Sequence, residues 1–269
     1  MKRKPYVAGY FYPSKADELK RMVSGFIDPH SEKKEALAVV SPHAGLVYSG
    51  RIAGAVYSSV ELPDTCVLIG PSHGYATHKA AVMSEGIWNT ALGDIPVNEQ
   101  AASEILKRIP WITEDADIHS QEHSLEVQLP FLKYLKPELS IIPILISYYA
   151  QYSDLTELGK AVADGIKDYG KKVLIVASTD MSHQVSQETA KKKDFMAIDE
   201  ILKLQPKKLY EVVKENNISM CGFQPTVSAM VAAQELGARK AELVQYQTSG
   251  DVTGDYQEVV GYAGIRIFK

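Results

Sequence analysis

Runs of apolar residues of strand length alternate along the chain with longer segments in which apolar residues recur at helical spacing. In runs such as 65–70 and 172–178, consecutive residues are apolar rather than every second one. That pattern is typical of central strands whose two faces are both covered by helices. A Gly/Asp-rich connection near residue 250 joins the last two apolar runs, which indicates an antiparallel edge there.

The order of these segments predicts the fold class. The predicted strands are 37–42, 65–70, 79–84, 140–147, 172–178, 239–246 and 257–267. The predicted helices are 14–27, 49–61, 98–107, 121–136, 152–168, 186–204, 206–216 and 223–236. We expect an α/β fold with a central, largely parallel but mixed sheet and helices on both of its faces.

Composition narrows the class of protein. No Gly/Ser-rich linker, repeat or low-complexity segment divides the chain, so we expect one domain over residues 1–269. A net charge of -4 gives no positive field that would gather nucleic acid. Two cysteines form no disulfide framework, and no apolar run is long enough to cross a bilayer. Because Pro5, Gly9 and Pro13 interrupt the region where a signal peptide would lie, we expect a cytoplasmic protein without a membrane partner.

Three of the predicted strands run into a histidine within a few residues of their end. The stretches LAVVSPHAG, CVLIGPSHG and KVLIVASTDMSH end near His43, His73 and His183. In open α/β sheets, ligands bind beyond the carboxyl ends of the strands, where loops from neighbouring strands converge. We therefore expect the three imidazoles to face one crevice.

Two further residues extend this predicted site. Asp180 precedes His183 by three positions, and its carboxylate suits orienting an imidazole or moving a proton. Cys221 lies just before a predicted helix start, where the helix macrodipole favours thiolate over thiol. Two imidazoles and a thiolate make a three-point metal site with open positions, acceptable to zinc, Fe(II) or copper. A nucleophilic role for Cys221 beside an imidazole is the alternative.

A second histidine motif lies in the stretch HSQEHSLEVQLPFL. His119, Glu122 and His123 match the inverted zincin pattern H-x-x-E-H, which requires both histidines on one helical face. Ser120 is the best N-cap residue here, and a helix that starts at Ser120 leaves His119 outside its turns. We favour a supporting role for His123 and Glu126 beside the metal site over a peptidase centre.

The motifs taken together resemble a known family. The stretches AGYFYP, SPHAGLVYSG, GPSHG, EHSLEVQLPFL, STDMSH, CGFQPTVSAM and TSGDVTGDYQEVVGYAG resemble the Memo family, whose prokaryotic members include AmmeMemoRadiSam system protein B. They occur in the family's order and extend from Ala8 to Gly264. The resemblance implies a fold similar to the class III extradiol (LigB-like) dioxygenases, in which two histidines and a glutamate hold Fe(II).

The resemblance also implies roles for single residues. His43 and His73 match the two histidine ligands, and Cys221 takes the place of the carboxylate ligand. His183 is similar to the acid/base histidine of the dioxygenases, with Asp180 beside it. Tyr48 matches a pocket tyrosine of the family, and Phe11 falls where some relatives have tryptophan. We expect both residues, with His123, to line the substrate pocket. Because thiolate is softer than carboxylate and is oxidisable, ring cleavage does not follow from the shared fold.

Three functions are left open by the sequence. The first is a metal-dependent oxidoreductase that binds a small-molecule substrate at one Fe(II), Cu or Zn ion. The second is a non-catalytic binding or adaptor module that uses the same crevice for a peptide or protein partner. The third is a metal-dependent hydrolase, in which zinc-bound water attacks an amide or ester.

Overall fold

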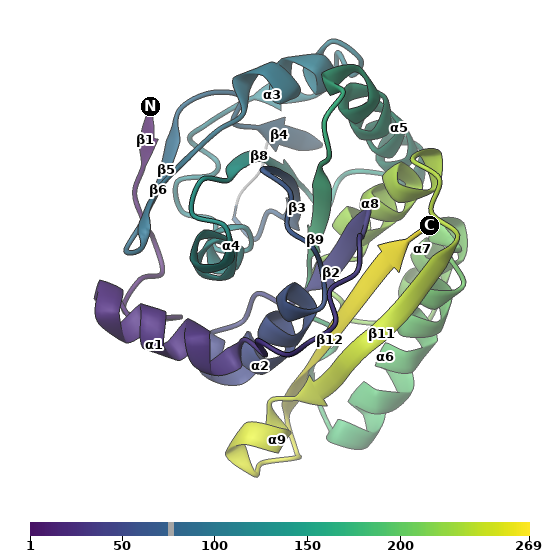
Figure 1. Ribbon diagram of the computed structural model, residues 1–269. Coiled ribbons are helices and arrows are strands. Elements are labelled where there is room, and N and C mark those ends of the chain that lie inside the picture. Colours follow the sequence, from purple (N-terminus) through teal and green to yellow (C-terminus); the bar gives the residue numbers. More distant parts are fainter. Residues whose placement is uncertain (75–77) are drawn as a thin grey trace.

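The centre of the molecule is a mixed β-sheet, described by a computed structural model that covers residues 1–74 and 78–269. Within these residues the sheet has nine strands in the order β10-β12-β2-β9-β3-β8-β4-β7, with β11 paired to β12 (Figure 1). Its middle is parallel and consists of β2 (Ala38–Ser41), β9 (Leu174–Ser178), β3 (Thr65–Pro71) and β8 (Ser140–Ile146). The predicted α/β class with a largely parallel centre is confirmed.

Antiparallel strands border this parallel centre. They are β12 (Val259–Phe268), β11 (Lys240–Thr248), β10 (His183–Val185) and β4 (Ala80–Val82), and β4 also pairs with β7 (Thr113–Glu114). A separate three-stranded sheet contains β1 (Lys2–Arg3), β5 (Ile87–Thr90) and β6 (Gly93–Pro96). Five of these strands were not predicted from the sequence, and each is shorter than five residues. They are β1, β5, β6, β7 and β10.

Both faces of the central strands are buried, which explains their continuous apolar sequence. In β3, Val67 and Ile69 pack into one hydrophobic core, while Cys66 and Leu68 pack into another on the opposite face. The first core contains α3 (Glu99–Leu106), α5 (Tyr152–Tyr169), α6 (Gln187–Leu202), α7 (Pro206–Glu215) and α8 (Phe223–Glu235). The second contains α1 (Ala16–Phe26), α2 (Leu46–Ser58) and α4 (Leu129–Leu135). None of the described helices is long and apolar enough to cross a bilayer.

The helix predicted at 121–136 begins later than expected. The 3-10 turn η1 (Glu126–Gln128) leads into α4, and residues 119–125 form turns instead. The Glu122 carboxylate accepts hydrogen bonds from the backbone N–H groups of His73 (2.6 Å) and Ser124 (2.8 Å). The bonds to His73, which is distant in sequence, and to Ser124 replace a first helical turn. Pro130 then falls in the first turn of α4, where its missing N–H costs nothing.

The N-terminal segment is tied to these turns by a buried ion pair. Arg3 Nη2 lies 2.7 Å from Glu126 Oε2, and each side chain is only 1% exposed. The Arg3 guanidinium also donates to the carbonyls of His119 and Glu122, and it lies 4.1 Å from the Trp88 ring centroid. Arg3 therefore joins β1, β5 and the 119–126 turns.

We expect Arg3→Gln to destabilise the protein by about 3 kcal/mol or more, because it leaves the Glu126 carboxylate buried without its ionic partner. Urea unfolding of the variant at neutral pH measures this loss. The matched control is Lys2→Gln, which removes an exposed pair with Asp94 and should cost less than about 1 kcal/mol. Similar losses in both variants would contradict the assignment of Arg3 as a structural tie.

Candidate functional site

The predicted histidines lie at the carboxyl end of the parallel strands. His43 follows β2, His73 follows β3, and His183 is reached through the turn that follows β9. Since β9 lies between β2 and β3, the loops after these strands are neighbours (Figure 1). Sheet topology therefore brings together residues that are far apart in the sequence, as predicted.

Three imidazoles form a compact group in this crevice. One ring nitrogen from each of His43, His73 and His123 lies within 4.8 Å of the other two, a spacing that suits a shared metal ion. The ring centroids are 5.2 Å apart for His43 and His73, and 4.5 Å apart for His73 and His123. His123, expected to line the substrate pocket, thus also lies within reach of a metal held by His43 and His73.

Hydrogen bonds fix the tautomer of His43. Its Nδ1 lies 2.9 Å from the Ser178 hydroxyl, which donates its single proton to the carbonyl of Ser124 at 2.6 Å. The hydroxyl can therefore only accept from His43, so Nδ1 carries the proton and Nε2 keeps its lone pair. Gln128 donates to the same hydroxyl and completes its bonding. His43 is thus prepared to bind a metal through Nε2.

Glu122 fixes the tautomer of His73 and also contacts His123. Its Oε1 lies 2.9 Å from His73 Nδ1 and 3.4 Å from His123 Nδ1. A carboxylate only accepts hydrogen bonds, so Nδ1 of His73 carries a proton and Nε2 is the atom available to a metal. The sequence reasoning missed this role for Glu122. The signal for it is the H-x-x-E-H stretch, in which the glutamate can serve a histidine outside the motif.

Burial and charge set the protonation of the group. Burial, with the neighbouring imidazoles, lowers the pKa of His43 well below its usual range, and burial also lowers the pKa of His123. Both are thus neutral near pH 7, the form that ligates metals. Burial is the largest single influence and opposes charge on His73, but the hydrogen bond to Glu122 together with the charges of Glu122 and Asp180 raises the pKa of His73. At Glu122 burial is again the largest single influence, but the two hydrogen bonds from His73 and the charges of His73 and His123 together lower the pKa of that carboxyl to about 2.

Cys221 lies against this group, just before α8. Its Sγ is 3.3 Å from His43 Nε2, and the backbone N–H of Asp180 donates to the sulfur. The expectation that the start of α8 favours thiolate is wrong, because other influences on the thiol outweigh the helix. Burial, reinforced by the Asp180 charge, raises the pKa of the Cys221 thiol. A metal that takes this sulfur as ligand therefore has to displace its proton.

Asp180 and His183 do not form the expected pair. The Asp180 Oδ1 accepts hydrogen bonds from the backbone N–H groups of His43 (2.8 Å) and Ala44 (3.3 Å), and burial raises the pKa of this carboxyl. His183 Nδ1 instead donates to the carbonyl of Ser219 at 2.9 Å, and the Ser219 hydroxyl accepts from the His183 backbone N–H. Ser219 rather than Asp180 therefore orients His183, because Asp180 is occupied by the loop after β2.

A pocket of about 580 Å³ adjoins the histidine group. The predicted pocket residues Phe11, Tyr48 and His123 line it, together with Asp180 and His183. The ring of Phe11 is 5.0 Å from that of His123. The structure thus collects these five side chains around one opening.

Glu126 lies behind this pocket rather than in it. Besides its ion pair with Arg3, its carboxylate accepts from the backbone N–H groups of Tyr6 and Val7 and from the Tyr12 hydroxyl. Glu126 therefore holds the N-terminal segment beside the turn that carries His123. Its supporting position agrees with the expectation, although its partners lie outside the predicted helix.

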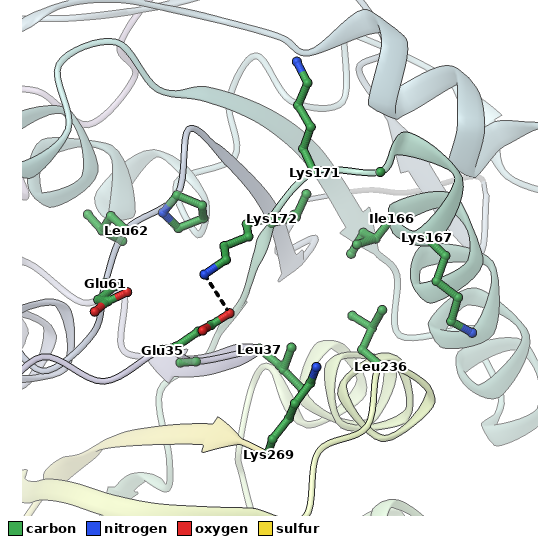
Figure 2. A pocket seen from close by; sticks show the side chains of 14 residues that line it. Glu35, Leu37, Glu61, Leu62, Ile166, Lys167, Lys171, Lys172, Leu236 and Lys269 are labelled. Atoms are coloured by element: carbon green, nitrogen blue, oxygen red, sulfur yellow. Dashed lines mark ion pairs between the residues drawn. The ribbon is translucent and has the colours of Figure 1, made fainter.

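A second cavity of about 420 Å³ lies at the other end of the parallel strands, beside the residues that precede β2, β3 and β9. Figure 2 shows that lysines, glutamates and apolar side chains surround it, with Lys172 paired to Glu35 at 3.0 Å. Its lining residues include no histidine or cysteine. The carboxyl end of the sheet is therefore the better candidate for metal chemistry.

His119 lies apart from the three grouped histidines. Its side chain is fully buried, its ring packs edge-on against Trp88 at 5.8 Å, and neither ring nitrogen has a hydrogen-bond partner among the described residues. Because residues 119–123 form turns, the H-x-x-E-H residues do not share one helical face. The geometry therefore lacks the zincin arrangement.

Comparison with known proteins identifies the family. The family profile described as Memo-like protein matches residues 3–266. The chain belongs to the Memo family. It is 40% identical to a MEMO1 family protein of Aquifex aeolicus, with 98% of each chain covered, and 39% identical to one of Methanocaldococcus jannaschii, with 97% of each covered. A MEMO1 family protein of Methanococcus maripaludis is 38% identical and is covered over its whole length by 99% of this chain.

One solved structure supports the fold. The crystal structure of an uncharacterized protein from Escherichia coli K12 superposes with a TM-score of 0.58 at 14% sequence identity. The match covers 84% of this chain and 98% of the other. At this identity the likeness extends to the arrangement of helices and strands alone.

The burial of His119 leads to a prediction about how the free energy of unfolding depends on pH. Burial, with the nearby charge of Arg3, lowers the pKa of His119 to about 3. As pH falls from about 6.5, the unfolded chain takes up a proton that the folded chain refuses, which costs up to about 1.4 kcal/mol per pH unit. We expect His119→Leu to give a shallower loss of unfolding free energy between about pH 6 and pH 4.5, measured by urea titration.

The control for this experiment is His30→Leu, which changes an exposed histidine. It should leave the slope of unfolding free energy against pH unchanged. A slope that is also unchanged in His119→Leu would show that His119 does not contribute to acid sensitivity.

Proposed function

We propose that this Memo family protein is a metal-dependent oxidoreductase that uses His43, His73 and Cys221 to hold one transition metal ion. The observation that carries the proposal is that His43 and His73, whose tautomers are fixed, lie together in one group, and that Cys221 Sγ is 3.3 Å from His43 Nε2. Mixed imidazole and sulfur ligands suit Fe(II), copper and zinc. His123 offers a further nitrogen from the side of the pocket.

A bound iron or copper ion would supply one-electron redox chemistry at its open positions. The protein's own residues would bind and orient the substrate. Phe11 and Tyr48 would hold it beside the metal, and His183 would accept or donate the proton through Nε2, because its Nδ1 is bonded to Ser219. Buried Asp180 would keep the loop of His43 in place through its two backbone contacts.

The donor set favours redox over hydrolytic chemistry. Catalytic zinc sites of hydrolases commonly use histidine and carboxylate ligands, whereas a cysteine ligand is itself oxidisable. Aromatic walls beside the metal donors fit a planar organic substrate. The hydrolase and the non-catalytic binding module are therefore outcomes against which the proposal is tested.

The first test concerns the metal. We expect anaerobically purified protein to bind one Fe(II), copper or zinc ion, measured by elemental analysis after dialysis. Glu122→Gln should weaken binding by about 10- to 100-fold, because the amide no longer orients His73 as the carboxylate does. His30→Gln is the control and should bind as the unchanged protein does.

Cobalt substitution tests whether the third ligand is the sulfur of Cys221 or a ring nitrogen of His123. The Co(II) protein should show thiolate-to-metal charge-transfer absorption in the near ultraviolet, and Cys221→Ser should abolish it. If His123→Ala abolishes metal binding while Cys221→Ser leaves it intact, the ligand set is the three histidines instead. Absence of any bound metal would remove the proposal.

The second test concerns turnover. With ascorbate as electron donor, the Fe(II) or copper protein should consume dissolved oxygen, measured with an oxygen electrode. We expect His183→Gln to reduce the rate by roughly 100-fold while metal content is unchanged, because proton transfer at the site is lost. Oxygen-independent ester hydrolysis by the zinc form would instead support the hydrolase, and a metal-loaded protein inert in both assays would support the binding module.

A further inference from the structure

The pocket beside the histidine group has an unusual balance of charge. Its lining includes the carboxylates of Asp180, Asp255 and Glu258 and no lysine or arginine. Asp255 and Glu258 are exposed, follow the short helix α9 (Gly250–Thr253), and make no ion pair within the described part of the chain. Unpaired carboxylates at the opening of a pocket favour cations and repel anions.

The walls of the same pocket are aromatic. Tyr10, Phe11 and Tyr48 line it, and Tyr10 is 88% exposed while Tyr48 is 41% exposed. Aromatic faces bind planar rings and also attract ammonium groups through their π-electrons. The walls therefore suit a ligand that is both flat and positively charged.

Tyr262 adds a polar contact in the interior of the pocket. This side chain is only 2% exposed, and its hydroxyl makes no hydrogen bond within residues 1–74 and 78–269. Burial and the charge of Asp180 raise the pKa of Tyr262, so it keeps its proton. A phenol that faces a pocket and has no protein partner can donate its proton to a ligand that carries an oxygen substituent.

We propose that this pocket takes an aromatic amine, with its polar ring substituent bonded to Tyr262 and its ammonium group held near the opening by Asp255 and Glu258. The inference rests on the proposed function, because it names the substrate class of the same site. It also disfavours an anionic peptide as occupant, since such a ligand would approach carboxylates of its own charge.

Three para-substituted phenols that differ in charge test the proposal. They are tyramine, which carries an ammonium group, neutral p-cresol, and anionic 4-hydroxyphenylacetate. Isothermal titration calorimetry at low salt should rank them in that order, with tyramine about tenfold tighter than 4-hydroxyphenylacetate. The difference should shrink at high salt, because the carboxylates near the opening are exposed. Each titration is done with the zinc-loaded and with the EDTA-treated protein.

Two variants assign the recognition to its residues. The double change Asp255→Asn and Glu258→Gln should remove the preference for tyramine over p-cresol and leave p-cresol affinity unchanged. Its matched control is Asp17→Asn with Glu32→Gln, two exposed acids outside the pocket lining, which should keep the preference.

Tyr262→Phe keeps the ring and removes only the hydroxyl. It should weaken tyramine about fivefold and leave phenethylamine, which lacks the phenol oxygen, unchanged. An unaltered thermal unfolding midpoint would show that the fold is intact in this variant. Equal losses for both amines would contradict the assigned hydrogen bond.

The outcomes separate this inference from the proposed function. Binding of 4-hydroxyphenylacetate as tightly as tyramine, or no binding of any probe in either form, overturns the inference. A metal-loaded protein with the reversed ranking overturns the substrate class alone. The expected ranking in a protein that takes up no metal supports the substrate class and contradicts the oxidoreductase.

Discussion

The parallel pairing of β2 with β9 and of β9 with β3 determines where the chemistry of this protein lies. Each of these strands ends in a loop at the same edge of the sheet, so three distant parts of the chain meet there. The strands themselves are held by two apolar cores on opposite faces. Since a shift of one residue would exchange the faces of every side chain, the register and hence the site are strongly fixed.

Hydrogen bonds then convert this meeting of loops into an ordered set of metal donors. The Ser178 hydroxyl and the Glu122 carboxylate each occupy an Nδ1, which leaves Nε2 of His43 and His73 as the atoms that can bind a metal. Fixed tautomers and ring orientations lower the reorganisation that metal binding requires. Cys221 differs, because its buried thiol is protonated until a metal replaces that proton.

Much of the fold was predictable because the strongest sequence signal, continuous apolar runs, reports burial on both faces of a strand. The position of His43 and His73 followed from the same signal, since each lies just beyond such a run. Helix 121–136 was placed too early, because Glu122 bonds to His73, which lies far away in the sequence. The two-residue strand β1 likewise depends on its pairing with β5. Neither contact leaves a local pattern in the sequence.

The parts of the site that escaped prediction are therefore those decided by partners remote in sequence. His183 is three residues from Asp180 but is oriented by Ser219, while Asp180 is taken by the backbone of His43 and Ala44. Spacing alone suggested a pair that these other hydrogen bonds replace. The buried Arg3–Glu126 pair belongs to the same class of contact. Buried ion pairs add little net stability compared with apolar packing. The Arg3–Glu126 pair instead determines position. It fixes the N-terminal segment that carries Phe11 beside the turn that carries His123, and so forms one wall of the pocket.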